Sequence, residues 1–362
     1  MFTEQPPLRR TRTLTRRVLS SSLVDLLTGP HGVDRYTELV NPAWTVREAR
    51  AEVVAVDRST PRSVTLTLRA NRSFAGFGAG QHINLRLEID GRRVTRCYSP
   101  ASSQHRADGL LELTVGHHDG GVVSTWLRDH AAPGMVFGLD GAGGDFVLPD
   151  ERPNKIVLVS GGSGITPVLS MLRTLTDEGH AGAIHFVHYA RSAAEATYTA
   201  ELEEIAKQHS NVTVSHGFTR DTTNTDLHGR FSAEHADLGN AAVFVCGPPS
   251  LIEAVKAVCP DAHSESFVPP LIVIPANPSG GSVAFTASGV NTTDDGRSLL
   301  EQAEAAGLSP EHGCRMGICH TCTCRKTSGA IKNLITGEVS TAPDEDIRIC
   351  VSAPMGDVEI AI

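Results

Sequence analysis

Apolar and polar residues alternate with a period of two between about residues 49 and 150. The clearest stretches are β-branched runs separated by Gly, Asn and Asp, at residues 51–56, 63–68, 82–89 and 110–115. Alternation of this kind predicts short, half-buried strands joined by turns. We therefore expect a small antiparallel β-barrel over residues 49–150.

The pattern changes after residue 150. Residues 155–160 form a nearly continuous apolar run, which is typical of a strand buried on both faces. Strand-like and helix-like stretches then alternate, at residues 183–189, 193–208, 212–216, 242–246 and 249–258. This order predicts a parallel α/β domain over residues 151–266.

A proline-rich stretch separates this region from the C-terminal part. Residues 267–281 contain four prolines and end in two glycines, which is typical of a semi-rigid linker. Beyond it, residues 282–362 predict a strand, a helix over 298–306, a cysteine-rich loop and two short strands. The chain is thus expected to hold three domains behind an N-terminal extension.

That extension, residues 1–48, has a basic and amphipathic start. Five arginines stand against one acidic residue, Glu4, in the first 17 positions. Apolar residues 14, 18, 23, 26 and 27 are spaced as one helical stripe. Two interpretations stay open: peripheral contact with a membrane surface or a membrane-bound partner, and a capping helix with a solvated basic face, which the pattern alone favours.

Composition narrows the classes of function. The chain has 362 residues and a net charge of −9, which argues against nucleic acid as a partner. No run approaches about 18 apolar residues, so we expect no membrane-spanning helix. Eight cysteines without the spacing of a disulfide framework favour a reducing compartment, and we expect a monomer in the cytoplasm.

The cysteine-rich loop carries the most specific motif. Cys314, Cys319 and Cys322 follow a C-x4-C-x2-C spacing, and Cys350 comes 28 positions after Cys322. This is the ligand pattern of a plant-type [2Fe–2S] cluster. Four cysteines can also hold zinc, but zinc sites usually use two CxxC pairs, and a gap of four is unusual for them. We therefore expect an iron–sulfur cluster.

A second motif closes a predicted strand of the barrel. Arg96 and Tyr98 share one face of that strand, and Ser99 follows. A cation, a flat aromatic ring and a small hydroxyl are the groups that a flavin needs for its phosphate, its ring and its reacting nitrogen. The alternative is an ordinary strand whose arginine forms a surface ion pair.

A glycine-rich turn further on opens a predicted helix over residues 124–130. Backbone amides at such a turn suit a phosphate. The alternative is a simple N-cap by the serine. The candidate phosphate-binding residues are Gly121, Val122, Val123 and Ser124.

Two further turns follow apolar strands of the α/β domain. The first is Gly-Gly-Ser-Gly-Ile-Thr-Pro at residues 161–167, which departs from the Rossmann fingerprint because proline replaces its third glycine. The second is Cys-Gly-Pro-Pro at 246–249. Carboxyl ends of parallel strands line the ligand crevice, so we expect a dinucleotide there. The candidate residues are Gly162, Gly164, Thr166, Pro167, Gly247 and Pro248, with Cys246 near the nicotinamide or simply a buried thiol.

The motifs in this order resemble the ferredoxin–NADP reductase superfamily, in its oxygenase and desaturase reductase branch with a C-terminal plant-type ferredoxin. The resemblance covers about residues 49–362. It implies a multidomain fold: an antiparallel β-barrel flavin domain, a parallel α/β NAD(P) domain and an α+β ferredoxin domain of the β-grasp type. It also implies that Tyr98 stacks on the isoalloxazine, that Ser99 approaches flavin N5, and that Glu265 and Phe267 lie beside the flavin.

The resemblance implies a function as well. Electrons pass from NADPH through the flavin and the [2Fe–2S] cluster to a terminal oxygenase or acyl desaturase. The acceptor could instead be a P450 or a ring-hydroxylating dioxygenase. We expect FAD because of the Gly-x-x-Ser turn, although FMN stays open. An iron–sulfur redox sensor is the competing class, but a sensor needs neither a flavin site nor a nicotinamide site.

Cations at the far end of the nucleotide site favour NADPH over NADH. No acidic residue follows the second strand of the α/β domain, where NADH-specific sites place a carboxylate. The Thr-Arg pair after the third strand is similar to the Ser-Arg pair that NADP-binding relatives use. The candidate clamp for the 2′-phosphate is Arg191, Ser192, Thr219 and Arg220. In the alternative, Arg220 pairs with Asp221 or Asp226 on the surface.

Overall fold

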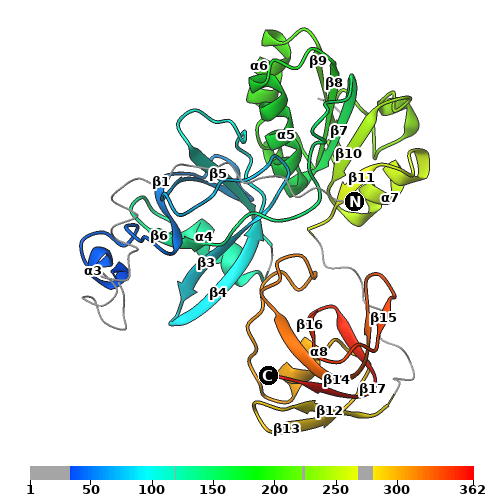
Figure 1. The fold of residues 1–362 in the computed structure, drawn as a ribbon. Coiled ribbons are helices and arrows are strands. Elements are labelled where there is room, and N and C mark those ends of the chain that lie inside the picture. The colour runs from blue at the N-terminus through cyan, green and yellow to red at the C-terminus, as the bar shows by residue number, and fades with distance from the viewer. Residues whose placement is uncertain (1–32, 119, 222–224, 268–279) are drawn as a thin grey trace. The chain divides into compact units, whose positions relative to one another are not determined.

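The computed structural model describes residues 33–118, 120–221, 225–267 and 280–362 (Figure 1). The described chain separates into two compact units, with the main division after Phe267. Each unit has hydrophobic clusters of its own. The basic stripe of residues 1–32 and most of the proposed linker lie outside the described residues. Within the described part, no helix is both long enough and apolar enough to cross a membrane.

The first unit begins with an antiparallel sheet that forms a half-barrel, in the order β4-β3-β6-β1-β2-β5. In β2, Val64, Leu66 and Leu68 are buried and the two threonines between them are partly exposed, as the alternation predicts. Two helices accompany the sheet, α3 (Asp34–Glu38) and α4 (Val122–His130). The strands are β1 (Ala49–Asp57), β2 (Ser63–Ala70), β3 (Ile83–Ile89), β4 (Arg92–Tyr98), β5 (Leu110–Gly116) and β6 (Val136–Leu139).

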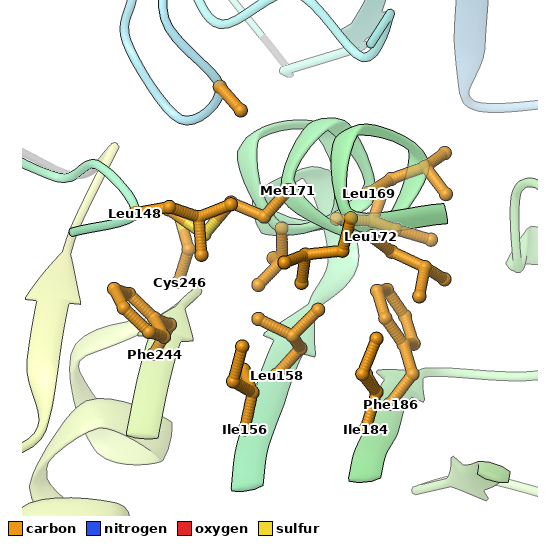
Figure 2. Packing of buried hydrophobic residues seen from close by; sticks show 14 of the residues in the cluster. Leu148, Ile156, Leu158, Leu169, Met171, Leu172, Ile184, Phe186, Phe244 and Cys246 are labelled. Carbon is orange, nitrogen blue, oxygen red and sulfur yellow. The ribbon is translucent and has the colours of Figure 1, made fainter. Parts of the chain in front are cut away.

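The same unit continues with a parallel sheet in the order β11-β10-β7-β8-β9. Its strands are β7 (Lys155–Gly161), β8 (Ala183–Ala190), β9 (Val212–Phe218), β10 (Ala242–Cys246) and β11 (His263–Glu265). Its helices are α5 (Ile165–Asp177), α6 (Thr199–Gln208) and α7 (Pro249–Val258). Figure 2 shows Leu169 and Leu172 of α5 packed over Ile156 and Leu158 of β7.

The prediction of one helix over residues 193–208 was wrong in its length. Residues 193–208 do not form one helix. A short 3-10 turn, η3 (Ala193–Glu195), comes first, and α6 begins only at Thr199. Tyr198 between them has a φ of 65°, a left-handed conformation that a continuous helix cannot contain. Its ring is held by contacts from distant residues, which the local pattern does not reveal.

The second unit contains a mixed sheet in the order β13-β12-β17-β14-β15, with β16 paired to β14. Helix α8 (Leu299–Ala305) begins after Ser298, whose capping box with Glu301 explains why the helix starts there. The expectation of two short C-terminal strands was wrong, since β14 and β17 have 11 and nine residues. The strands are β12 (Ser282–Phe285), β13 (Val290–Thr293), β14 (Thr323–Asn333), β15 (Val339–Ser340), β16 (Glu345–Arg348) and β17 (Ser352–Ile360).

Candidate functional site

The parallel sheet has a topological switch point between β7 and β10. These neighbouring strands lead into helices on opposite faces: α5 packs with Leu158, and α7 packs with Val157 and Val159. The turns after both strands therefore open beside each other at the carboxyl edge. A Cβ on Gly164 would lie 2.2 Å from the carbonyl oxygen of Cys246, so the two backbones are in direct contact. A switch point of this kind is where open α/β sheets bind nucleotides.

The turn after β7 leaves backbone donors for a phosphate. Helix α5 begins at Ile165, directly after a 3-10 turn, η2 (Gly162–Gly164), and no side chain caps either element. The Ile165 amide donates to the Gly162 and Ser163 carbonyls, so a phosphate would bind the amides of the turn itself. Gly162 has a φ of 56°, which only glycine adopts without strain. Thr166 and Pro167 are buried, and the Thr166 hydroxyl donates to the Ser163 carbonyl at 3.3 Å. These two candidates thus shape the turn from within. Gly162 is exposed on the turn, whereas Gly164 is buried against the backbone of Cys246.

The ends of β8 and β9 lie at the same carboxyl edge of the sheet, beyond β7. The amide of Arg220 donates to the Arg191 carbonyl at 2.9 Å, and the Thr219 hydroxyl donates to the Ala190 carbonyl at 3.3 Å. This pairing brings the four clamp residues, including Ser192, together at one edge. Arg191 forms an ion pair with Glu195 at 3.6 Å. The Arg220 guanidinium makes no ion pair within the described residues, and Asp226 instead accepts from the His216 amide.

Cys246 and Glu265 lie opposite each other on β10 and β11. Burial raises the pKa of Glu265 to about 7, and its Oε2 has no hydrogen-bond partner within the described residues. Burial, followed by the charge of Glu265, raises the pKa of the Cys246 thiol. Phe267 is partly buried against the same core. A neutral thiol and an unsatisfied carboxyl oxygen fit the amide and ring of a nicotinamide. Gly247 and Pro248 follow Cys246 and lead into α7.

Sequence reasoning missed a row of side chains near the carboxyl ends of the parallel strands. Cys246, Ser160, His188 and His216 lie side by side in register on four neighbouring strands. The Ser160 hydroxyl and His188 Nδ1 are 2.8 Å apart, and burial lowers the pKa of His188 to about 3. The only signal in the sequence is a polar residue near the end of each apolar strand.

The flavin motif also has an unsatisfied group. Ser99 follows β4 and is 3% exposed, and its hydroxyl has no partner within the described residues. Arg96 Nη1 donates to the Thr95 carbonyl at 2.8 Å, and Tyr98 is half-buried at the end of β4. A buried orphan hydroxyl beside a half-covered aromatic ring fits a flavin, because burying an unpaired hydroxyl costs free energy.

Helix α4 offers a phosphate site of the same type as α5. It starts at Val122, two residues before the expected start at Ser124, and Gly121 precedes it without a side-chain cap. The amides of Val122 and Val123 therefore have no acceptor within the helix. The Ser124 hydroxyl lies 3.5 Å from the Gly121 carbonyl, so it closes the turn rather than capping the helix from outside.

The cysteine loop of the second unit fits an iron–sulfur cluster. The sulfur atoms of Cys314 and Cys319 lie within 4.8 Å of each other. The Cys322 and Cys350 thiols contact each other, and this contact lowers the pKa of Cys322 and raises the pKa of Cys350. Two thiols that share a proton in this way lie close enough to bind one metal group. Backbone amides also point at sulfur, from Cys314 to Cys319 Sγ at 3.2 Å and from Met316 to Cys314 Sγ at 3.3 Å.

The backbone of this loop is held close to the neighbouring chain. Gly317 has a φ of 76°, and a Cβ there would lie 2.8 Å from Cγ2 of Val351. Arg348 Nη1 donates to the Gly317 carbonyl at 2.5 Å, which ties the loop to the strand before Cys350. The loop is thus shaped by the fold and not by its cysteines alone.

Comparisons with known proteins agree with this arrangement. Three family models match successive parts of the chain: an oxidoreductase FAD-binding domain at 52–148, an oxidoreductase NAD-binding domain at 158–257, and a 2Fe-2S iron–sulfur cluster binding domain at 285–355. An NADPH oxidoreductase of Mycobacterium tuberculosis is 34% identical over 346 residues, which cover 93% of this chain and 90% of that protein.

Two further proteins are similar to this chain over most of its length. A glycine betaine monooxygenase reductase subunit of Pseudomonas aeruginosa is 30% identical over 324 residues, covering 78% of this chain and 87% of that protein. Among solved structures, phthalate dioxygenase reductase superposes with a TM-score of 0.58 and 22% identity, covering 86% of this chain and 97% of that chain. That reductase has a modular structure for electron transfer from pyridine nucleotides to [2Fe-2S].

Proposed function

Since the chain belongs to the oxygenase-reductase branch of the ferredoxin–NADP reductase superfamily, we propose that it takes hydride from NADPH in preference to NADH and serves a terminal oxygenase. The family makes it an NAD(P)H-dependent oxidoreductase with FAD-, NAD- and [2Fe–2S]-binding domains. When bound, these groups supply hydride donation, the change from two-electron to one-electron transfer, and delivery of single electrons.

The chain's own groups set the geometry of this transfer. We assign the phosphates of the nucleotide and the flavin to the backbone amides of the turn before α5 and of the start of α4. The orphan hydroxyl of Ser99 is available to the reacting edge of the flavin. Burial keeps the Cys246 thiol neutral beside the nicotinamide position. Cys314, Cys319, Cys322 and Cys350 are the proposed ligands of the cluster.

The preference for NADPH rests on one observation: the Arg220 guanidinium has no ionic partner within the described residues, at an edge where Arg191 also lies. A 2′-phosphate would accept charge-assisted hydrogen bonds there, each worth about 1.5–3 kcal/mol. Arg220→Ala should therefore raise the KM for NADPH well over tenfold and leave the KM for NADH nearly unchanged. Lys207→Ala, which removes an exposed cation of α6, is the matched control.

Two results would contradict the clamp: an equal loss with both nucleotides, or a native enzyme that prefers NADH. The acceptor is tested separately, by reconstitution with a diiron desaturase, a ring-hydroxylating oxygenase and a P450. Within the oxygenase class we favour no single acceptor. We also propose that the protein is a monomer and that it works in the cytoplasm, where thiols stay reduced.

A specific observation favours a membrane as an additional partner. Large apolar side chains gather on and after α3, where Tyr36, Leu39, Val40 and Trp44 are 54%, 83%, 74% and 58% exposed. They follow the five arginines of residues 1–17 in the chain. Exposed aromatic and aliphatic groups, in a chain segment whose sequence is also rich in arginine, suit an anionic lipid surface. We propose that this segment binds such a surface peripherally.

Co-sedimentation with vesicles tests this contact. The full chain should bind phosphatidylglycerol vesicles several-fold better than phosphatidylcholine vesicles. Replacing Leu39, Val40 and Trp44 together by Ser should abolish the difference. Val258→Ser, which removes an exposed apolar side chain elsewhere, is the control. Equal binding by the triple variant and the wild type would favour the capping-helix interpretation.

A further inference from the structure

Helix α5 joins the nucleotide turn to the flavin motif through one buried arginine. Arg173 lies two turns from the helix start and is 16% exposed. Its Nη1 donates to the Ala101 carbonyl and to Glu112 Oε1, both at 2.8 Å. Its Nε and Nη2 donate to the two carboxylate oxygens of Glu201 at 2.7 and 2.6 Å. One guanidinium therefore binds three distant segments.

The partners of Arg173 belong to both halves of the first unit. Ala101 comes two residues after Ser99, and Glu112 lies in β5 of the half-barrel. Glu201 lies in α6 of the nucleotide region. Arg173 also lies 5.2 Å above the ring of Tyr198, whose hydroxyl bonds to Thr114 of β5. The left-handed Tyr198 that interrupts the expected helix is thus part of the same contact.

Other residues of α5 bind the segment that follows the flavin motif. The Ser170 hydroxyl donates to the Ser102 carbonyl at 2.7 Å, in a fully buried contact. Thr174 Oγ1 accepts from the Gln104 amide at 3.2 Å. A helix is stiff over this length, so α5 transmits the position of residues 101–104 to its own first turn. That first turn is the proposed nucleotide cradle.

We propose that Arg173 is a positioning residue, which fixes the nicotinamide site against the flavin site through α5. It touches neither cofactor position itself. The proposal rests on the proposed sites at Tyr98, Ser99 and Gly162–Gly164. Hydride transfer depends steeply on distance and alignment, and a misplacement of about 1 Å can lower a rate about a hundredfold. Affinity for each cofactor alone depends on local contacts that Arg173 does not make.

The test uses the full-length holoenzyme with Arg173→Gln and Arg173→Lys. Stopped-flow reduction of the flavin at saturating NADPH should slow by about tenfold to a hundredfold in Arg173→Gln. The KM for NADPH and the flavin content should stay within about twofold of the wild type, since kcat and not binding is affected. The long-wavelength charge-transfer absorbance between nicotinamide and flavin should weaken in parallel. Lys keeps the cation but cannot bridge all three segments, so it should rescue only in part.

Arg106→Lys is the matched control. Arg106 contacts the same Glu112 at 3.8 Å and pairs with Asp108, but it does not reach α5. Its flavin reduction rate should be unchanged. A normal rate and a normal charge-transfer band in Arg173→Gln, with only a lower Tm, would overturn the proposal. A wild type that reduces no flavin with either nucleotide would instead refute the proposed function.

A second variant keeps the test decisive if Arg173→Gln does not retain flavin. Ser170→Ala removes the buried bond to Ser102 and leaves no charge unpaired. Flavin reduction at saturating NADPH should then slow at least threefold with unchanged flavin content. An unchanged rate in Ser170→Ala would overturn the proposal in that case.

Discussion

Lys326 offers the sharpest prediction about stability, because its side chain is fully buried in the C-terminal unit. Its Nζ donates to the carbonyls of Gly329 and Ala342 at 2.7 and 2.6 Å. It also forms an ion pair with Glu345 Oε1 at 2.9 Å. Lys326 and Glu345 lie opposite each other on β14 and β16. These strands connect directly to Cys322 and Cys350, so the ammonium holds together two strands that carry proposed cluster ligands.

Lys326→Met should lower the stability of this unit by about 3 kcal/mol. Removal of one partner of a buried ion pair costs about 3–5 kcal/mol. The lower end applies because the Glu345 side chain is 28% exposed and can be hydrated in part. For a domain of this size, 1 kcal/mol corresponds to about 4–8 °C, so cluster release should shift down by about 12–24 °C.

The assay follows the visible absorbance of the cluster in the full-length protein during heating at a fixed rate. Lys332→Met, an exposed lysine of the same strand, is the matched control. The double variant Lys326→Met/Glu345→Gln should recover part of the loss, because it leaves no unpaired carboxylate. A release temperature for Lys326→Met within about 3 °C of the Lys332→Met control would refute the reasoning, since that difference is under 1 kcal/mol.

Two further predictions concern the proposed site residues. Cys319→Ser should abolish the iron–sulfur absorbance and leave flavin reduction by NAD(P)H intact, and two irons per chain in that variant would exclude Cys319 as a ligand. Burial raises the pKa of Glu265 to about 7, so its contribution to stability is complete below its unfolded pKa and is lost as the pH rises through 7. Glu265→Gln should therefore have the same Tm as the wild type at pH 4. At pH 8 its Tm should be higher than that of the wild type, by the equivalent of about 3 kcal/mol. If the variant and the wild type have the same Tm at pH 8 as well as at pH 4, the carboxyl does not titrate in this way.

The fold class and the family could be read from the sequence, because their signals are local. A period of two predicts half-buried strands, and a buried strand followed by a glycine turn and a helix predicts a nucleotide crevice. The spacing of Cys314, Cys319 and Cys322 is a property of one loop. The fold and the family were confirmed, whereas the roles of the individual site residues stay predictions.

The local sequence pattern does not predict the burial of a polar side chain when its partners come from distant segments. Lys326 lies in a strand of mostly polar residues, so the sequence predicts neither the length of β14 nor the burial of its lysine. The row of Ser160, His188 and His216 exists only through the register of three strands. A polar residue in a sequence predicts exposure. Lys326, Ser160 and His188 are buried exceptions that have hydrogen-bond partners. His216 is an exception of another kind, because neither of its ring nitrogens has a hydrogen-bond partner within the described residues.

Arg173 shows why buried polar residues of this kind occur near functional sites. A buried arginine is stable only if several acceptors surround it, and those acceptors must come from segments that the fold has already brought together. The same requirement makes it sensitive to any change in how those segments are placed. An apolar residue at this position could fill the space. It would not, however, form the directional bonds that hold Ala101, Glu112 and Glu201 in place relative to α5. Directional hydrogen bonds can hold two cofactor sites in alignment, whereas apolar packing alone lets the packed segments slide past each other. Positioning residues are therefore to be sought among the buried charged side chains.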